Sequence, residues 1–176
     1  MQSTSDFERL VLCHLDAAYN LARWLSASPH DADDIVQEAC LRAHRAFQTL
    51  RSDDARAWLL TIVRNVFLNR LEQKRNERLR LVTLDHVDLP SEKADEPITG
   101  LIQSADAQRL HQAIASLEIE FRETIVLREI EGLSYKQVAE VTRVPIGTVM
   151  SRLARARKRL FDLLCEEGDT AQRARS

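Results

Sequence analysis

The chain has 176 residues, 44% hydrophobic residues and a formal net charge of −2. This suits one domain or two small domains with packed cores and excludes a large multidomain enzyme. Four glycines and four prolines supply few of the turns that a β-sheet protein needs, so the predicted fold class is all-α. With no run of about 18–20 apolar residues and no basic-then-apolar N-terminal segment, we expect a cytoplasmic protein without membrane insertion.

The N-terminal part begins with two predicted helices. Ser5 and Glu8 have the spacing of a capping box, and apolar residues then recur at helical spacing, which predicts a first helix over 5–26. A Ser-Pro dipeptide ends this pattern, and Asp31 is expected to cap a second helix that ends near Phe47.

A polar loop over 48–53 precedes a third predicted helix, which begins near Asp54. Its apolar face includes Trp58, which favours a core position for the indole, and its end is a basic tail that reaches Arg78. Three amphipathic helices of this kind predict one small bundle.

The C-terminal part is again helical. Helical periodicity covers 107–116 and 120–131. Ser134 and Gln137 are spaced as a capping box for a short helix, and Pro145 suits the first turn of a last helix that ends near Cys165. The predicted organisation is an N-terminal bundle over 1–75, an acidic flexible linker over 76–107, a C-terminal bundle over 108–165 and a polar tail over 166–176.

The strongest local motif covers 132–160, where a capped short helix, a tight turn and a longer cationic helix follow one another. This is the layout of a helix-turn-helix. Apolar residues define the core face of the last helix: Val149, Leu153, Ala156, Leu160 and Leu164. The opposite face carries Thr148, Ser151, Arg152, Arg155 and Arg159. Such a face favours DNA binding, because arginine bonds bidentately to guanine in the major groove. A solvated cationic face near a helix C-terminus is the alternative.

Two polar surfaces of the N-terminal bundle are candidates for binding another molecule. The acidic start of the second helix, from His30 to Glu38, favours docking of a basic partner, although acidic residues also stabilise a helix N-terminus electrostatically. The third helix has a polar face with Thr61, Arg64, Asn65 and Asn69, which favours a recognition surface. Neither surface has the nucleophile, phosphate loop or ligand spacing of a catalytic or metal site, so we expect no catalytic residue, metal or cofactor. Cys13, Cys40 and Cys165 are widely spaced, which favours buried thiols.

Three ordered segments make the chain resemble an extracytoplasmic-function sigma factor of the bacterial sigma-70 family: DADDIVQEACLRAHRAF, ARAWLLTIVRNVFLNRLEQKR and FRETIVLREIEGLSYKQVAEVTRVPIGTVMSRLARARKRL. The resemblance covers about residues 5–165. It implies a non-enzymatic subunit that binds core RNA polymerase, directs it to promoter DNA and is restrained by an anti-sigma factor in a stress or signal response. The linker would be a strand-mimicking acidic segment.

The resemblance also implies roles for individual residues. The polymerase interface would comprise Asp31, Asp34, Gln37 and Glu38. The loop from Gln48 to Asp54 would capture a flipped base of the −10 element, and its neighbours in −10 recognition would be Arg56, Thr61, Arg64, Asn65 and Asn69. The −35 element would contact Thr148, Ser151, Arg152, Arg155, Arg157 and Arg159, with Arg152 and Arg157 on phosphates.

The chain departs from the family pattern in two places. Met150 and Ala154 occupy positions where relatives often carry longer side chains, which leaves the −35 sequence open and suits Met150 to apolar contact with a thymine methyl group. The loop before Trp58 has no aromatic residue, which leaves the captured base open. Two other functions remain: a stand-alone helix-turn-helix regulator, which would bind promoters tightly without polymerase, and a helical adaptor, in which Arg155→Ala would leave activity intact.

Overall fold

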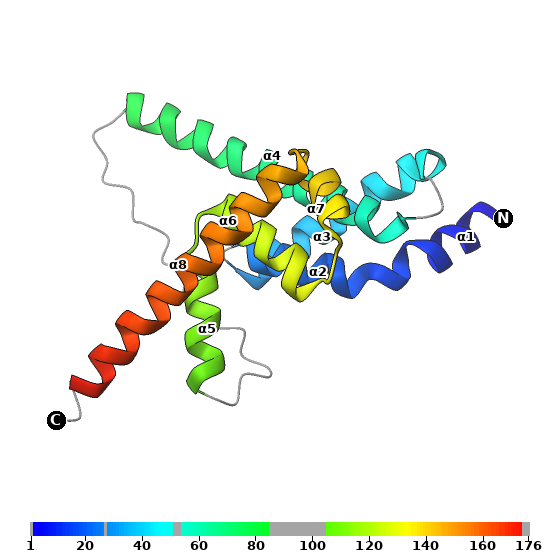
Figure 1. Cartoon of the computed structure of the whole chain (residues 1–176). Coiled ribbons are helices and arrows are strands. Elements are labelled where there is room, and N and C mark those ends of the chain that lie inside the picture. Colours follow the sequence, from blue (N-terminus) through cyan, green and yellow to red (C-terminus); the bar gives the residue numbers. More distant parts are fainter. Residues whose placement is uncertain (1, 27, 51–53, 85–104, 174–176) are drawn as a thin grey trace. The chain divides into compact units, whose positions relative to one another are not determined.

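The computed structural model describes residues 2–26, 28–50, 54–84 and 105–173. The chain divides into two compact units, Met1–Asp95 and Glu96–Ser176 (Figure 1). The described residues form helices and no strands, which confirms the all-α class. None of the helices in the described ranges combines the length and apolarity that a membrane span requires.

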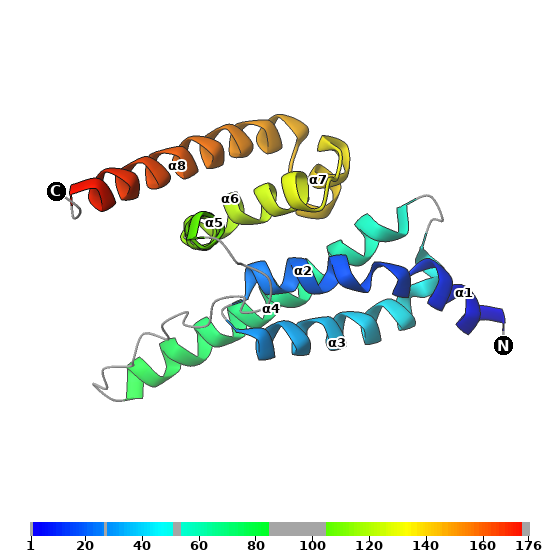
Figure 2. The same ribbon diagram turned by 90° about the horizontal axis from the view of Figure 1, so that it is seen from below.

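The first unit contains α1 (Gln2–Leu10), α2 (Leu15–Leu25), α3 (Pro29–Ala46) and α4 (Ala55–Leu84). Each of α2, α3 and α4 packs against the other two, as Figure 2 shows. Their shared core consists of fully buried aliphatic side chains, which include Leu21, Ile35, Leu59, Leu60, Val63 and Val66. Burial of each such side chain contributes roughly 1.5–3 kcal/mol to folding, which makes this bundle a stable platform.

The predicted first helix is wrong as one continuous element. It begins at Gln2, so Ser5 is not its cap, and it is interrupted after Leu10 by a 3-10 turn, η1 (Leu12–His14). Phe7 packs edge-on against the rings of His44 and Phe47, with centroids 5.2 and 5.4 Å apart. The break lets α1 turn toward the end of α3, where Phe7 is buried.

The cap of α3 also differs from the prediction. Ser28 is the N-cap, and its hydroxyl accepts a hydrogen bond of 3.1 Å from the backbone N–H of Asp31. Pro29 occupies the first turn, where its missing N–H costs nothing. Asp31 is therefore three residues inside the helix, and its carboxylate is available for other contacts.

Helix α4 continues to Leu84, beyond the predicted start of the linker at residue 76. Its first half is packed in the bundle, whereas residues 71–80 are exposed. In Figure 2 this end projects past α2 and α3. One helix thus contains a packed half and a solvated half.

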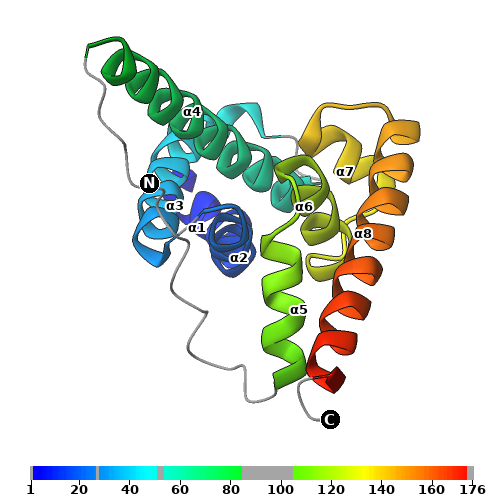
Figure 3. The same cartoon turned by 90° about the vertical axis from the view of Figure 1, so that its left-hand side faces the viewer.

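The second unit contains α5 (Ala105–Ala115), α6 (Ile119–Ile125), a π-helical turn η4 (Val126–Ile130), α7 (Tyr135–Thr142) and α8 (Ile146–Arg173). Figure 3 shows α5 beside α8, where Arg109 donates a hydrogen bond to the carbonyl of Leu164. Contacts among α6, α7 and α8 enclose a core that includes Val126, Leu127, Val138, Val149 and Leu153.

The helix-turn-helix follows its sequence signals closely. Gly132 has φ +67°, a left-handed conformation that suits glycine, and the capping box of Ser134 and Gln137 is present. The turn between α7 and α8 passes through Arg143 at φ 56°, which is unusual for a residue with a Cβ. Pro145 lies immediately before α8 and its carbonyl accepts the first hydrogen bonds of that helix.

Two further predictions are corrected. Helix α8 runs to Arg173 rather than ending near Cys165, so most of the predicted tail over 166–176 continues the helix. Among the thiols, only Cys40 is partly buried, whereas Cys13 and Cys165 are exposed. Burial raises the pKa of the Cys40 thiol. The acidic residues 85–104 of the predicted linker lie outside the described residues.

Candidate nucleic-acid interface

Helix α8 has one buried face and one open face. Val149, Leu153 and Ala156 are buried against the rest of the second unit, whereas Leu160 and Leu164 are only half-buried. The open face carries the predicted DNA-contacting residues: Ser151, Arg155, Arg157 and Arg159 are exposed, and Thr148 and Arg152 are partly buried. Four of the six side chains expected to face DNA are thus exposed on α8.

Arg155 and Arg159 lie with Lys158 along one side of a shallow groove of about 310 Å³. The groove is also lined by the apolar side chains of Leu117 and Phe121 and by two acidic residues, Glu118 and Asp162. Within the described residues, these three cations form no ion pair with an acidic side chain at salt-bridge distance. They are therefore placed to contact an external anion such as a phosphate.

Arg152 has a different environment. Its guanidinium lies 3.0 Å from a carboxylate oxygen of Glu120 and 3.6 Å from one of Glu123. The Glu123 side chain is 2% exposed and that of Arg152 is 18% exposed. This ion pair joins α8 to α6, so Arg152 holds the cationic helix on the bundle.

Arg157 is also engaged within the unit, because it donates a hydrogen bond to the carboxylate of Glu129. That hydrogen bond, together with the charge of Glu129, raises the pKa of the Arg157 guanidinium. The guanidinium of Arg128 lies 4.8 Å from the ring centre of Tyr135 and donates a hydrogen bond of 2.7 Å to the carbonyl of Leu133. The carboxylates that fix α8 lie on α6 and η4, more than twenty residues earlier in the chain, and the sequence alone does not reveal them.

The corner between α5 and α6 is fixed by a partly buried arginine. Arg122 donates hydrogen bonds to the carbonyls of Ala115 and Leu117, the latter at 2.9 Å. Burial lowers the pKa of this guanidinium. Arg122 thus closes the end of α5 next to Leu117, one of the residues that line the groove.

In the first unit, the predicted −10 face follows the packed half of α4. Arg56, Thr61, Arg64 and Asn65 are half-buried, and Asn69 is exposed. The Thr61 hydroxyl donates a hydrogen bond of 2.8 Å to the carbonyl of Ala57, so it already has a partner within α4. Trp58 is half-buried rather than fully enclosed.

The predicted base-capturing loop is described in part. Gln48 and Thr49 are exposed in the 3-10 turn η2 (Phe47–Thr49), and residues 51–53 lie outside the described ranges. Asp54 accepts a hydrogen bond of 3.2 Å from the N–H of Ala57 and so caps α4. The loop therefore leads directly into the helix with the −10 face.

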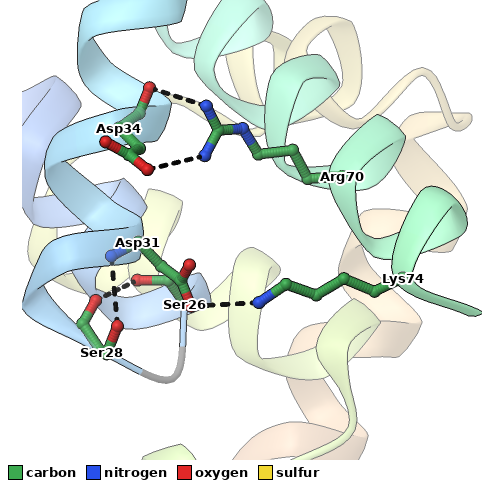
Figure 4. Close-up of polar contacts among 6 residues, drawn as sticks. All are labelled: Ser26, Ser28, Asp31, Asp34, Arg70 and Lys74. Atoms are coloured by element: carbon green, nitrogen blue, oxygen red, sulfur yellow. Dashed lines mark hydrogen bonds and ion pairs between the residues drawn. The ribbon is translucent and has the colours of Figure 1, made fainter.

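The acidic face of α3 is joined to α4 by ion pairs, drawn in Figure 4. The ammonium group of Lys74 lies 3.3 Å from the carboxylate of Asp31. The guanidinium of Arg70 lies 3.5 Å from the carboxylate of Asp34 and donates a hydrogen bond of 3.2 Å to the backbone carbonyl of the same residue. These two cations of α4 were not anticipated, because they are 36 and 43 residues away from their partners.

The remaining two residues of the predicted polymerase interface lie one turn further along α3. Glu38 pairs with Arg42 at 2.7 Å, and Gln37 is exposed. In the described part of the chain no cluster of three His, Cys, Asp or Glu side chains has the geometry of a metal site. The carboxylates of the acidic face are thus partly solvated and partly neutralised by cations of α3 and α4.

The two units match two family models in the order found along the chain. Sigma-70 region 2 matches residues 10–77, and Sigma-70, region 4 matches residues 107–160. The chain is 36% identical over 169 residues to the ECF RNA polymerase sigma factor SigE of Mycolicibacterium smegmatis, which covers 96% of this chain but only 65% of that relative. It is 35% identical over 159 residues to the ECF RNA polymerase sigma factor SigM of Mycobacterium tuberculosis, with 90% and 76% covered.

A solved structure agrees with these relatives. The sigma factor RpoE, in complex with the anti-sigma factor NepR from Bartonella quintana, superposes with a TM-score of 0.72 at 31% identity, covering 90% of this chain and 96% of that one. Similarity therefore extends through both units, in sequence as well as in fold. The chain belongs to the extracytoplasmic-function sigma factors of the sigma-70 family.

Proposed function

We propose that this protein is a transcription initiation subunit, not an enzyme, which binds core RNA polymerase in the cytoplasm and directs it to promoter DNA. The observation that carries the proposal is the combination, on one chain, of a region 2 bundle with an acidic face and a region 4 helix-turn-helix with an open cationic face. A stand-alone regulator would use the second surface but has no use for the first.

The acidic face of α3 is the proposed polymerase interface. Its contact residues are Asp31, Asp34, Gln37 and Glu38, which lie on successive turns of one helix and are all at least partly exposed. Carboxylates on a rigid helix suit a basic partner surface, because opposite charges accelerate encounter and set the docking register.

Promoter recognition is divided between the two units. On α4 the proposed −10 contacts are Arg56, Thr61, Arg64, Asn65 and Asn69. On α8 the proposed −35 contacts are Thr148, Ser151, Arg155 and Arg159, supported by Arg152 and Arg157, whose ion pairs give them an additional anchoring role. In this assignment the modules predicted over 1–75 and 108–165 are the two DNA-binding modules, and the linker predicted over 76–107 is shorter, because α4 continues to Leu84 and α5 begins at Ala105.

Each module alone binds DNA weakly at physiological salt, and tethering both on the polymerase raises their effective concentration at a promoter. Restraint by an anti-sigma factor is part of the proposal, because the similar RpoE chain was solved in complex with one.

The test is transcription in vitro with core bacterial RNA polymerase, this protein and fragmented genomic DNA, followed by sequencing of transcript 5′ ends. New start sites with shared −35 and −10 elements are expected. No new start sites, with DNA binding retained, would contradict the proposal and indicate the stand-alone regulator.

Two variants separate the surfaces. We expect Arg155→Ala to cost roughly 1–3 kcal/mol of promoter recognition without changing polymerase affinity. Charge reversal of Asp34 and Glu38 to lysine is expected to do the opposite. Arg9→Ala and Asp16→Lys, which change exposed charges elsewhere, serve as matched controls. If both test variants weakened only the binding of free protein to DNA, the assignment would fail.

A further inference from the structure

The first turn of α8 presents an apolar edge to solvent. Ile146 and Met150 are 42% and 52% exposed, although each is a large hydrophobic side chain. They are four residues apart, so their side chains are neighbours on the helix surface. The same part of α8 buries Val149 and Leu153 completely on its other side, so the core does not need the two exposed residues.

Two polar side chains at this end of α8, those of Ser151 and Arg152, already have partners inside the unit. The Ser151 hydroxyl donates a hydrogen bond of 3.0 Å to the carbonyl of Thr148. Arg152 is held by the carboxylates of Glu120 and Glu123. The first arginine of the open face without such an ion pair in the described residues is Arg155, more than two turns from the start of the helix.

Gly147 is an independent indication that another molecule approaches this end of α8. A Cβ built at this position meets no atom within 4 Å, so packing inside the unit does not require glycine. In a helix interior glycine costs about 1 kcal/mol relative to alanine, and in the first turn of α8, where Gly147 lies, the cost has the same sign but is smaller. A glycine that is unfavourable for the helix and unnecessary for packing is suited to close approach of another molecule to the backbone.

We infer that Ile146, Gly147 and Met150 form a specificity-determining edge that contacts thymine methyl groups in the major groove of the −35 element. This rests on the proposed function, in which α8 is the recognition helix. Residues near the N-terminus of such a helix contact base edges. Thymine is the base whose major-groove edge carries an apolar group, whereas cytosine presents an amino donor that an apolar side chain leaves without a partner. The edge therefore favours A·T pairs at the positions it covers.

The experiment uses the full chain with core RNA polymerase. Duplexes bound by the holoenzyme are selected from a random library, and each thymine of the enriched −35 element is then replaced by deoxyuridine. This removes the methyl group and keeps the hydrogen-bonding edge. At one or two positions we expect binding to weaken about fourfold, which corresponds to ~0.8 kcal/mol for one buried methyl group.

Variants connect the methyl groups to the edge. Met150→Ala is expected to bind thymine and deoxyuridine duplexes equally at one of the sensitive positions. Lys158→Ala, which removes an exposed cation from the same helix, is expected to weaken binding to both duplexes by the same factor. Gly147→Ala is expected to raise the thermal stability of the protein while weakening promoter binding, a combination that a purely structural role for Gly147 does not produce.

The outcomes separate the two proposals. If the library is enriched but no deoxyuridine substitution has an effect, or if Met150→Ala keeps full sensitivity, the thymine-contacting edge is refuted and the initiation function stands. If the holoenzyme enriches no sequence at all, the proposed function fails and the apolar edge fails with it.

Discussion

The ion pairs between α3 and α4 predict that a single substitution strengthens polymerase binding. Lys74 lies 3.3 Å from Asp31, and the two side chains are 51% and 31% exposed. A pair with this exposure is worth about 0.5 kcal/mol, within a range of about 0.2–1 kcal/mol. If a basic polymerase surface takes up the Asp31 carboxylate, it first has to displace Lys74. We therefore expect Lys74→Gln to raise affinity for core polymerase about twofold, within a range of about 1.4- to fivefold.

The assay is titration of labelled protein with core polymerase at low and high salt, because screening should reduce the gain at high ionic strength. Arg75→Gln removes the same charge from the next position of α4 and is the matched control. Asp31→Asn should weaken binding, and adding Lys74→Gln to it should give no further gain. A loss of affinity in Lys74→Gln, or an equal gain in Arg75→Gln, would refute competition between Lys74 and the polymerase.

Other predictions concern stability and reactivity. Arg152→Met should destabilise the second unit by roughly 1–3 kcal/mol in urea unfolding, because the buried Glu123 loses this cation. The slope of log affinity for promoter DNA against log salt concentration should change by less than one. Unchanged stability would contradict the anchoring role of Arg152. Arg143→Gly should stabilise the protein by about 0.5–1 kcal/mol by relieving the left-handed conformation, and a lower Tm would contradict this. Iodoacetamide should modify Cys40 more slowly than the exposed Cys13 at pH 7, because Cys40 is partly buried and burial raises its pKa, which leaves less thiolate; peptide mass spectrometry that showed equal rates would refute this.

Features encoded by neighbouring residues could be predicted from the sequence. The capping box at Ser134, the glycine at position 132 and the start of α4 at Asp54 each depend on residues within one turn of one another. The open face of α8 follows from helical periodicity in the same way. Local chemistry therefore predicted the helix-turn-helix and the location of its cationic face.

Features decided by distant contacts could not be predicted in this way. The break after Leu10 has no proline or glycine to signal it, and it accompanies the packing of Phe7 on the end of α3. The π-helical turn likewise has no local signature. The partners of Arg152 and Lys74 lie 32 and 43 residues away. Helical periodicity indicates which cations point outward, but it does not indicate which carboxylates they contact. Only the structure shows which cations anchor one helix to another and which are left to bind a partner.

The projecting half of α4 has a consequence for local stability. The 30-residue helix is about 45 Å long, yet over residues 71–80 it gains little from burial. In water a helical segment of this length is marginal by itself. Amide hydrogens should therefore exchange quickly in this half and slowly in the half that contains Leu59 and Val63, so that one continuous helix spans almost the whole range from fraying to global unfolding. A ligand that covered the projecting half would be detected first as slowed exchange there, with no change of secondary structure.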